Sequence, residues 1–264
     1  MAYVFKAKEL LSSREYGVLA YETIGSTNIE AKKIAKKSGD GQVLIADMQT
    51  DGRGRLGRSF FSPDEKGIYL SYIKEIPTNA ENLPLLTSFA GLAVCRACES
   101  LLPRFIQPLE IKWPNDIYID GKKICGILTN LLTDTKKNKI SHAIIGIGLN
   151  VNSSYSDFPD DLKSKAGSIY SQTGVEIKCE DVCKAIVLEL DKMFFDENIL
   201  ASPQPKLTEL LKARSYTIGK TVDFECDGKK LKGRATDIND DGSLKVAGMF
   251  GTKDLSTGEA VVIV

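Results

Sequence analysis

The stretch QTDGRGRLGRSFFSP, residues 49–63, decides which kind of α/β fold this sequence can adopt. Gly52, Gly54 and Gly57 match the G-x-G-x-x-G pattern of dinucleotide-binding folds. In those folds the glycine-rich turn leads directly into a helix, whose N-terminus binds the pyrophosphate. Here the glycines lead into RSFFSPDEKG, which contains a proline and lacks the apolar spacing of a helix. The stretch therefore argues against a dinucleotide-binding fold.

The same stretch carries three arginines, Arg53, Arg55 and Arg58, with glycines between them. A guanidinium binds a carboxylate or a phosphate through two parallel hydrogen bonds. Glycines let the backbone fold closely over a ligand, but they cost order when the ligand is absent. One arginine would indicate a solvated basic turn, whereas three predict a loop that orders around an anion.

The composition requires any such anion site to be local. Lys plus Arg and Asp plus Glu each number 35, so no overall field attracts nucleic acid or membrane. No apolar run reaches the roughly 18 residues of a membrane helix, and the N-terminus lacks a signal-peptide pattern, so we expect a cytoplasmic protein. The pairs Cys95/Cys98 and Cys179/Cys183 have a spacing that suits metals. With one histidine in the chain, buried core cysteines are favoured over a zinc site.

The order of apolar patterns predicts an α/β (α+β) protein. Thr27 opens a predicted helix that continues to Ser38, with Thr27 and Glu30 spaced as a capping box. Asp120 and Gly121 predict a tight hairpin turn. Strands are expected at 17–25, 42–50, 67–75, on both sides of residues 120–121, and at 139–152, and further helices at 85–102, 180–196 and 205–213.

From Tyr216 onward, short strands alternate with turns such as Asp227-Gly228 and Asp241-Gly242. This change predicts a separate β-barrel-like module with its boundary near Arg214. We therefore expect a first domain at residues 1–213 and a second at 214–264.

A second group of polar residues lies in IKWPNDIYIDGKKICG, residues 111–126. Pro114 forbids a helix and favours an extended Trp113, so Lys112, Asn115 and Asp116 should gather at a corner. Lys123 follows across the hairpin and alternates with Cys125 and Ile127, which predicts that it starts a buried strand face. A buried ammonium needs an anionic partner, and Lys123 has no acidic neighbour in sequence. The alternative is a surface lysine at the hairpin mouth.

A third pattern is AIIGIGLNVN, residues 143–152. Gly146, Gly148 and Asn150 fall on one face of a strand because side chains alternate with a period of two. That face has no side chain before Asn150, so a flat ligand could lie on the backbone. A bulge or a tight helix contact explains the glycines equally well.

In order along the chain, the segments GSTN, GRGRLGR, KWPNDIYIDGKKICGIL and GIGLNVN strongly resemble those of biotin–protein ligases (biotin–[acetyl-CoA carboxylase] ligases). FPDDLKSKAGSIY is similar to a further segment of that family. The resemblance runs from about Val18 to the end. It implies a mixed β-sheet catalytic domain of the biotin/lipoate ligase type, followed by a small C-terminal SH3-like β-barrel domain.

The resemblance also implies a two-step reaction. The carboxylate of biotin attacks the α-phosphate of ATP and gives biotinoyl-5′-AMP and pyrophosphate. The lysine of a biotin carboxyl carrier protein, such as the acetyl-CoA carboxylase carrier subunit, then attacks this mixed anhydride. The first step brings two anions together, so neutralisation by Arg, Lys and Mg²⁺ is the main catalytic task. Mg²⁺ is expected on the ATP phosphates rather than in a protein metal site.

Site residues follow from the same resemblance. The residues expected to bind biotin are Ser26, Thr27, Asn28, Gln49, Arg53, Gly54, Arg55 and Lys123. Those expected to bind ATP are Arg55, Arg58, Lys112, Asn115, Asp116 and Asn150. Lys123, Asp116 and Arg53 are the expected catalytic residues. Lys123 would meet the biotin carboxylate, which would supply its missing anionic partner, and Asp116 would help to deprotonate the acceptor amine.

Three departures from the family pattern accompany the resemblance. Phe60 stands where many bacterial relatives have Trp, and Asn130 stands where Glu is frequent. Only about seventeen residues precede the first strand, too few for the N-terminal helix-turn-helix of relatives that repress transcription, so no DNA binding is expected. A homodimer is conceivable by analogy, through the sheet edge near KISHAIIGIG.

Two alternative functions remain open on the sequence. A lipoate–protein ligase shares the fold and the reaction type, but usually has an Arg-Arg-x-Ser-Gly-Gly-Gly loop in place of GRGRLGR. A non-catalytic biotin sensor would need the missing N-terminal arm or a broken Lys123/Asp116 pair. Formation of a biotin adenylate or of a lipoate adenylate distinguishes the three.

Overall fold

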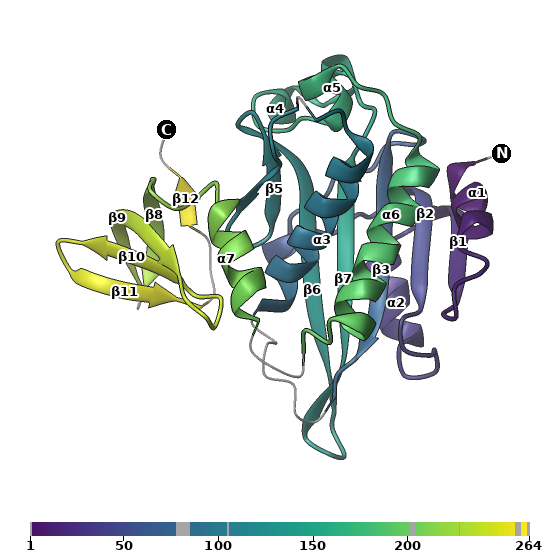
Figure 1. Ribbon diagram of the computed structural model, residues 1–264, viewed down its shortest axis with the longest axis horizontal. Coiled ribbons are helices and arrows are strands. Elements are labelled where there is room, and N and C mark those ends of the chain that lie inside the picture. Colours follow the sequence, from purple (N-terminus) through teal and green to yellow (C-terminus); the bar gives the residue numbers. More distant parts are fainter. Residues whose placement is uncertain are drawn as a thin grey trace.

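The computed structural model describes residues 2–77, 85–104, 106–200, 204–226, 228–256 and 260–262. A seven-stranded mixed sheet with helices on both faces makes up the larger part, and a five-stranded antiparallel sheet near the C-terminus makes up the smaller part (Figure 1). The predicted class, a mixed α/β protein with a small C-terminal β module, is confirmed.

The large sheet has the strand order β1-β2-β3-β7-β6-β5-β4. Its strands are β1 (Val18–Ile24), β2 (Val43–Gln49), β3 (Gly67–Glu75), β4 (Glu110–Lys112), β5 (Asp116–Ile119), β6 (Lys122–Asp134) and β7 (Lys139–Asn150). β1 and β2 run parallel and are joined by the helix α2 (Thr27–Ile34), whereas all other neighbours are antiparallel. From His142 onward β7 pairs with β3 on one side and β6 on the other. The segment KISHAIIGIG is therefore in the middle of the sheet, and the prediction that it forms an edge is wrong.

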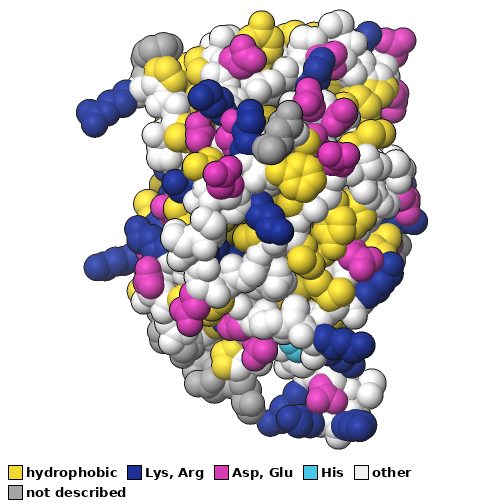
Figure 2. All heavy atoms as spheres, turned by 90° about the vertical axis from the view of Figure 1, so that its right-hand side faces the viewer, with side chains coloured by type: hydrophobic (Ala, Val, Ile, Leu, Met, Phe, Trp, Pro, Cys, Tyr) yellow, Lys and Arg dark blue, Asp and Glu magenta, His cyan; other side chains and the backbone are white. Residues whose placement is uncertain are grey.

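The outermost strands of the large sheet are β1 and β4, and the outer side of β4 is partly covered because Ile111 forms backbone hydrogen bonds with Arg214 and Tyr216. Figure 2 shows the β1 side, where a band of apolar side chains lies among charged ones. Leu19 on β1 is 37% exposed.

Helices cover both faces of the large sheet (Figure 1). α3 (Leu86–Leu101) and α6 (Cys179–Asp191) pack on one face together with α1 (Tyr3–Leu10), and α2 packs on the other. The remaining helical segments are η1 (Arg55–Gly57), η3 (Tyr155–Asp157), α4 (Asp160–Lys163), α5 (Ile169–Thr173), η4 (Lys192–Asp196) and α7 (Pro205–Ala213). The four cysteines considered for a metal lie in the α3–α6 core, and burial raises the pKa of Cys98, Cys179 and Cys183 to about 12. No helix within the described ranges is long and apolar enough to cross a bilayer.

The predicted capping box at α2 is wrong. Ser26 is the N-cap residue and makes no side-chain cap. The Thr27 backbone N–H and hydroxyl both donate to Gln49 Oε1 instead, at 2.9 and 3.2 Å. The helix also ends at Ile34, four residues before the predicted end at Ser38.

The small sheet has the order β11-β10-β9-β8-β12. Its strands are β8 (Thr221–Cys226), β9 (Lys229–Ile238), β10 (Leu244–Gly248), β11 (Gly251–Leu255) and β12 (Ala260–Val262). β11 was not predicted because GTKDL is polar at all but one position. Gly242, at φ +82°, confirms the Asp241-Gly242 turn, whereas Asp227 of the other predicted turn lies outside the described residues.

A buried ion pair fastens the N-terminal segment to α6. The Arg14 side chain is 4% exposed and donates from Nη2 to Asp191 Oδ1 at 2.6 Å and to the Gly41 carbonyl at 2.6 Å. The Tyr72 hydroxyl donates to the same carboxylate at 2.7 Å. Arg14 therefore joins the chain before β1 to α6 and β3.

Arg14→Ala is expected to lower the free energy of unfolding by about 3 kcal/mol, because it leaves the Asp191 carboxylate, which is only 16% exposed, without its cation. Urea denaturation followed by circular dichroism measures the change. Lys163→Ala is the control, since its pair with Asp160 is exposed and should contribute less than about 1 kcal/mol. A loss no larger than that of the control would show that the pair does not fasten the segment.

Candidate functional site

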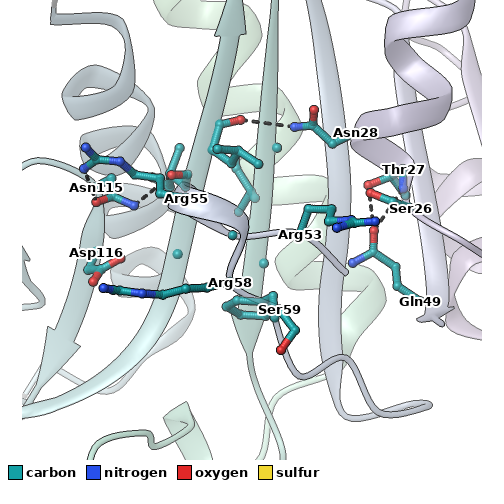
Figure 3. A pocket seen from close by; sticks show the side chains of 18 of the residues that line it. Ser26, Thr27, Asn28, Gln49, Arg53, Arg55, Arg58, Ser59, Asn115 and Asp116 are labelled. Carbon is teal, nitrogen blue, oxygen red and sulfur yellow. Dashed lines mark hydrogen bonds between the residues drawn. The ribbon is translucent and has the colours of Figure 1, made fainter. Parts of the chain in front are cut away.

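A cavity of about 130 Å³ opens where α2, β2, the arginine loop (residues 50–63) and the centre of the sheet meet (Figure 3). α2 and β2 contribute polar groups, the loop and the β5–β6 hairpin contribute charges, and β6 and β7 contribute backbone. The lining residues are Ser26, Thr27, Asn28, Gln49, Arg53, Gly54, Arg55, Arg58, Ser59, Phe60, Leu70, Asn115, Asp116, Lys123, Gly126, Ile127, Leu128, Gly146, Ile147 and Gly148.

Almost all residues proposed from the sequence meet in this cavity, with two exceptions. Asn150 is buried at the end of β7, where its Nδ2 donates to the Gly167 carbonyl at 2.9 Å. Lys112 lies on β4 with its ammonium 5.6 Å from the centre of the Tyr118 ring. Neither lines the cavity, so their role toward ATP remains a prediction. Sequence reasoning did not propose Ser59, Leu70 or Ile147, which carry no chemical signal of their own.

The polar end of the cavity is held in place by a chain of hydrogen bonds. Gln49 accepts from Thr27 through Oε1 and donates from Nε2 to Ser62 Oγ at 3.2 Å. The Ser71 hydroxyl donates to Thr27 Oγ1 at 2.9 Å. These contacts fix Thr27 and Gln49 before any ligand binds.

Asn28 leaves one acceptor unused at this end. Its Nδ2 donates to the Leu128 carbonyl at 3.1 Å, whereas its buried Oδ1 has no hydrogen-bond partner among the described residues. Glycine at 146 makes room for the amide, since a Cβ there would come within 2.3 Å of Asn28 Nδ2. An unsatisfied buried acceptor costs on the order of 1–3 kcal/mol, so this oxygen suits a ligand that brings an N–H group.

Side chains cover the strand face on which Gly146 and Gly148 lie. Gly126 and Gly148 are cross-strand partners, and the Phe60 ring lies over both of them. A Cβ at Gly148 would come within 2.6 Å of a ring carbon. The expectation of an open backbone face is therefore wrong for this state, because Asn28 and Phe60 cover it. A flat ligand must share this space with Phe60 or displace its ring.

A β-bulge changes the face on which Lys123 lies. Lys123 is opposite Tyr118 and Cys125 is opposite Ile117, so Ile124 is an extra residue in the ladder. The predicted alternation of Lys123 with Cys125 and Ile127 is therefore wrong. Lys123 shares the pocket face with Gly126, and a Cβ at Gly126 would be 3.3 Å from its ammonium.

Lys123 already has an acidic partner in the protein. Its ammonium is 2.7 Å from Asp116 Oδ1, on the strand across the hairpin. Lys123 therefore does not lack an anionic partner in the absence of a ligand, because the hairpin brings Asp116 back to it. The Lys123 side chain is 34% exposed, so a bound anion can approach the same ammonium.

The arginine loop places its charges unequally. Arg53 is half-exposed and pairs with Asp51 at 2.7 Å within the loop. Arg55 reaches across the cavity mouth and donates from Nη1 to Asn115 Oδ1 at 3.1 Å (Figure 3). Leu56, 76% exposed, has φ +55°, a region that is uncommon for a bulky residue. Four cations, Arg53, Arg55, Arg58 and Lys123, thus surround a lining that carries one carboxylate, that of Asp116.

A second, open groove of about 580 Å³ adjoins the cavity and extends toward the small domain. It is lined in part by the loop, by the Trp113–Asn115 corner, and by Gly242 and Ser256 of the small domain. Asn130, one of the departures from the family pattern, lies here with a buried Oδ1 that has no hydrogen-bond partner among the described residues.

Asp47 lies near the end of β2, shortly before the arginine loop begins. Burial, followed by the Asp64 and Glu65 carboxylates, raises the pKa of Asp47 to about 6. Its side chain makes a hydrogen bond with Asp64 and accepts from the Glu65 backbone. The residue is 3% exposed, so its protonated form is the one that the fold favours.

Asp47→Asn is expected to stabilise the protein above pH 6, by about 2–3 kcal/mol. The raised pKa means that stability from protonated Asp47 is complete below about pH 4 and is lost as the pH rises through 6, whereas asparagine donates to Asp64 at every pH. Thermal denaturation at pH 4.5, 6 and 7.5 should show a gain that grows with pH. Asp161→Asn, at an exposed position, is the control. A gain that is independent of pH would contradict the assignment.

Two family models match the chain. One, described as the biotin/lipoate A/B protein ligase family, matches residues 22–150, and the other, the biotin protein ligase C terminal domain, matches residues 217–262. The bifunctional ligase/repressor BirA of Bacillus spizizenii is 34% identical over 239 residues, which cover 90% of this chain and 71% of the relative. The biotin–[acetyl-CoA-carboxylase] ligase of Mycobacterium tuberculosis is 31% identical over 90% of this chain and 85% of its own length.

A similar solved structure is the biotin protein ligase of Aquifex aeolicus in complex with biotin and ATP. It superposes with a TM-score of 0.74 at 28% sequence identity, and the match covers 94% of this chain and 98% of that one. The structure of the Leishmania major enzyme, at 23% identity and a TM-score of 0.61, shares the fold.

Proposed function

Because this chain belongs to the biotin–protein ligases of the biotin/lipoate A/B protein ligase family, we propose that it attaches biotin to a lysine of a biotin carrier protein, such as the carrier subunit of acetyl-CoA carboxylase. The attachment proceeds through biotinoyl-5′-AMP. We assign the catalytic domain to residues 1–213 and the small domain to residues 214–264.

The observation that carries this proposal is the polarity of the cavity along its length. Thr27, Asn28 and Gln49 lie on one side of the cavity, and Arg55, Arg58 and Asp116, which pairs with Lys123, lie on the other (Figure 3). Biotin has the same order, with a neutral ureido ring at one end and a carboxylate at the other. The unpartnered Asn28 Oδ1 suits a ureido N–H. The dithiolane of lipoate has no N–H group, so this end favours biotin over lipoate.

In the first step the biotin carboxylate attacks the α-phosphorus of ATP, and pyrophosphate leaves. Both reactants are anions, so the arginines and Lys123 lower the barrier by neutralising the charge that gathers between them. Mg²⁺ bound to ATP would supply further positive charge for this step.

In the second step the carrier lysine must reach the mixed anhydride as a neutral amine. The open groove beside the cavity provides a path to it. Asp116, beside Lys123 at 2.7 Å, is placed to accept the proton of the incoming ammonium. The amine then displaces AMP, and the biotinyl amide remains on the carrier.

Incubation of the protein with Mg²⁺-ATP and either biotin or lipoate tests the proposal, with mass spectrometry to identify the adenylate. Biotinoyl-5′-AMP should form and the lipoate adenylate should not. Addition of a purified carrier domain should then give a carrier heavier by one biotinyl group, and a carrier whose acceptor lysine is replaced by arginine should stay unmodified. A lipoate adenylate, or no adenylate at all, would refute the proposal.

A further inference from the structure

Trp113 belongs in sequence to the corner that carries Asn115 and Asp116, but its side chain lies in the core of the small domain. It is 4% exposed and packs in an apolar cluster that strands β8, β9, β10 and β11 otherwise build. The larger domain therefore contributes one residue to the core of the smaller one.

Two hydrogen bonds hold Trp113 in that position. Its backbone N–H donates to Thr217 Oγ1 at 3.0 Å, and its indole Nε1–H donates to the Gly242 carbonyl at 2.9 Å. Gly242 is in the left-handed region at φ +82°, and a Cβ there would come within 2.7 Å of Leu85, just before α3. The small-domain turn at Gly242 is thus packed tightly between the indole and the larger domain.

The chain that leads from Trp113 into the cavity is equally well fixed. Two residues further on, Asn115 donates from Nδ2 to the Ile127 carbonyl at 3.0 Å and accepts from Arg55 Nη1 through Oδ1 at 3.1 Å. Arg55 is the loop arginine that crosses the cavity mouth. A continuous set of contacts therefore runs from the small domain through Trp113 and Asn115 to the arginine loop.

We propose that Trp113 is a positioning residue through which the small domain controls closure of the arginine loop. The small domain fixes the Trp113 indole, and this keeps the Asn115 carboxamide in position to accept the hydrogen bond from Arg55. That hydrogen bond stabilises the arginine loop over the adenylate. This inference rests on the proposed function, because its effect is the retention of biotinoyl-5′-AMP. The small domain would thus affect the cavity through Trp113, although none of its own side chains is among the residues that line the cavity.

Trp113→Phe tests the proposal, because the phenyl ring still fills the core but cannot donate to Gly242. Synthetic biotinoyl-5′-AMP should dissociate from this variant about 3- to 10-fold faster, the loss expected for one hydrogen bond. The KM for biotin should not change, because Thr27, Asn28 and Gln49 are unaffected. Phe250→Leu is the matched control. It weakens the same core where Phe250 meets Phe224 edge to face, but it lies away from the corner and should not alter dissociation.

A double-mutant comparison separates positioning from general destabilisation. In an Arg55→Ala background, Trp113→Phe should add no further increase in adenylate dissociation, because the contact through which it acts is already gone. Three results would each overturn the proposal: fully additive effects of Trp113→Phe and Arg55→Ala on adenylate dissociation, a wild-type dissociation rate in Trp113→Phe, or an equal increase in that rate in Phe250→Leu.

Fluorescence of the unaltered protein gives a second test, since Trp113 is the only tryptophan of the chain. Its emission should change when biotinoyl-5′-AMP is added to the wild type, and the change should be absent in Arg55→Ala. An adenylate that binds without any change in emission would refute the coupling. A wild-type protein that forms no adenylate from biotin and ATP would instead count against the proposed function.

Discussion

Lys123→Gln is expected to reduce the formation of biotinoyl-5′-AMP by at least about 100-fold while the protein remains folded. The ammonium lies 2.7 Å from Asp116 in the cavity, where the proposed reaction brings the biotin carboxylate and the α-phosphate together. Loss of a cation at such a place removes on the order of 3 kcal/mol of transition-state stabilisation. Glutamine removes the charge but keeps a polar side chain that is only one bond shorter. Single-turnover formation of the adenylate, measured by rapid quench, gives the rate.

Lys122→Gln is the control for this prediction. Lys122 is the preceding residue, and its ammonium donates to the Ser164 carbonyl at 2.7 Å in an exposed position. The same substitution there should leave the rate within about twofold of wild type, as expected for surface positions that carry no special contact. A Lys123→Gln enzyme that forms adenylate at a similar rate would show that the ammonium has no part in the first step.

Arg55→Gly should release biotinoyl-5′-AMP about 10- to 100-fold faster than wild type, because it removes a charge-assisted contact across the cavity mouth. The adenylate should still form, since Lys123 and Arg58 remain. Released adenylate is a reactive anhydride, so this variant should also label lysines of unrelated proteins. Dissociation of radiolabelled adenylate and biotinylation of added serum albumin measure the two effects.

Arg53→Gly is the informative comparison, because the resemblance makes Arg53, and not Arg55, the expected catalytic arginine. Arg53 is half-exposed and pairs with Asp51 inside the loop, whereas Arg55 contacts Asn115 on the opposite side of the cavity. We therefore expect a smaller release from Arg53→Gly. If both variants release the adenylate equally fast, the total charge of the loop, and not the Arg55 contact, retains it. If Arg55→Gly retains the adenylate as tightly as wild type, the arginine loop is not a lid.

Most of the strands and the long helices could be predicted from the sequence, because they depend on local patterns. Most of the polar residues that line the cavity were expected from the resemblance to biotin–protein ligases. The alternation of polar and apolar residues in β8, the apolar run of β2 and the arginines of the loop can all be read directly from the sequence. α1 was missed because its buried residues, Tyr3, Val4 and Ala7, occupy barely two turns between charged residues. A helix this short is stabilised by tertiary contacts. One of them is the hydrogen bond that the Tyr3 hydroxyl donates to the Ala46 carbonyl at 3.0 Å.

What could not be predicted depends on contacts between distant parts of the chain. The bulge at Ile124 leaves no mark in the sequence, yet it decides which face Lys123 occupies. The Gly126–Gly148 pairing depends on the register of β6 against β7, and Phe60 reaches it from a loop far away in sequence. The position of the Trp113 side chain depends on Thr217 and Gly242, more than 100 residues later.

The central pairing of β3 with β7 has a consequence for the synthesis of the chain. β3 is buried at every position from Gly67 to Lys74, and its partner residues end at Asn150. During synthesis this strand therefore has no partner on its β7 side while the chain is extended from residue 76 to residue 150. Slow elongation before Asn150 prolongs the interval in which this strand can pair with another nascent chain.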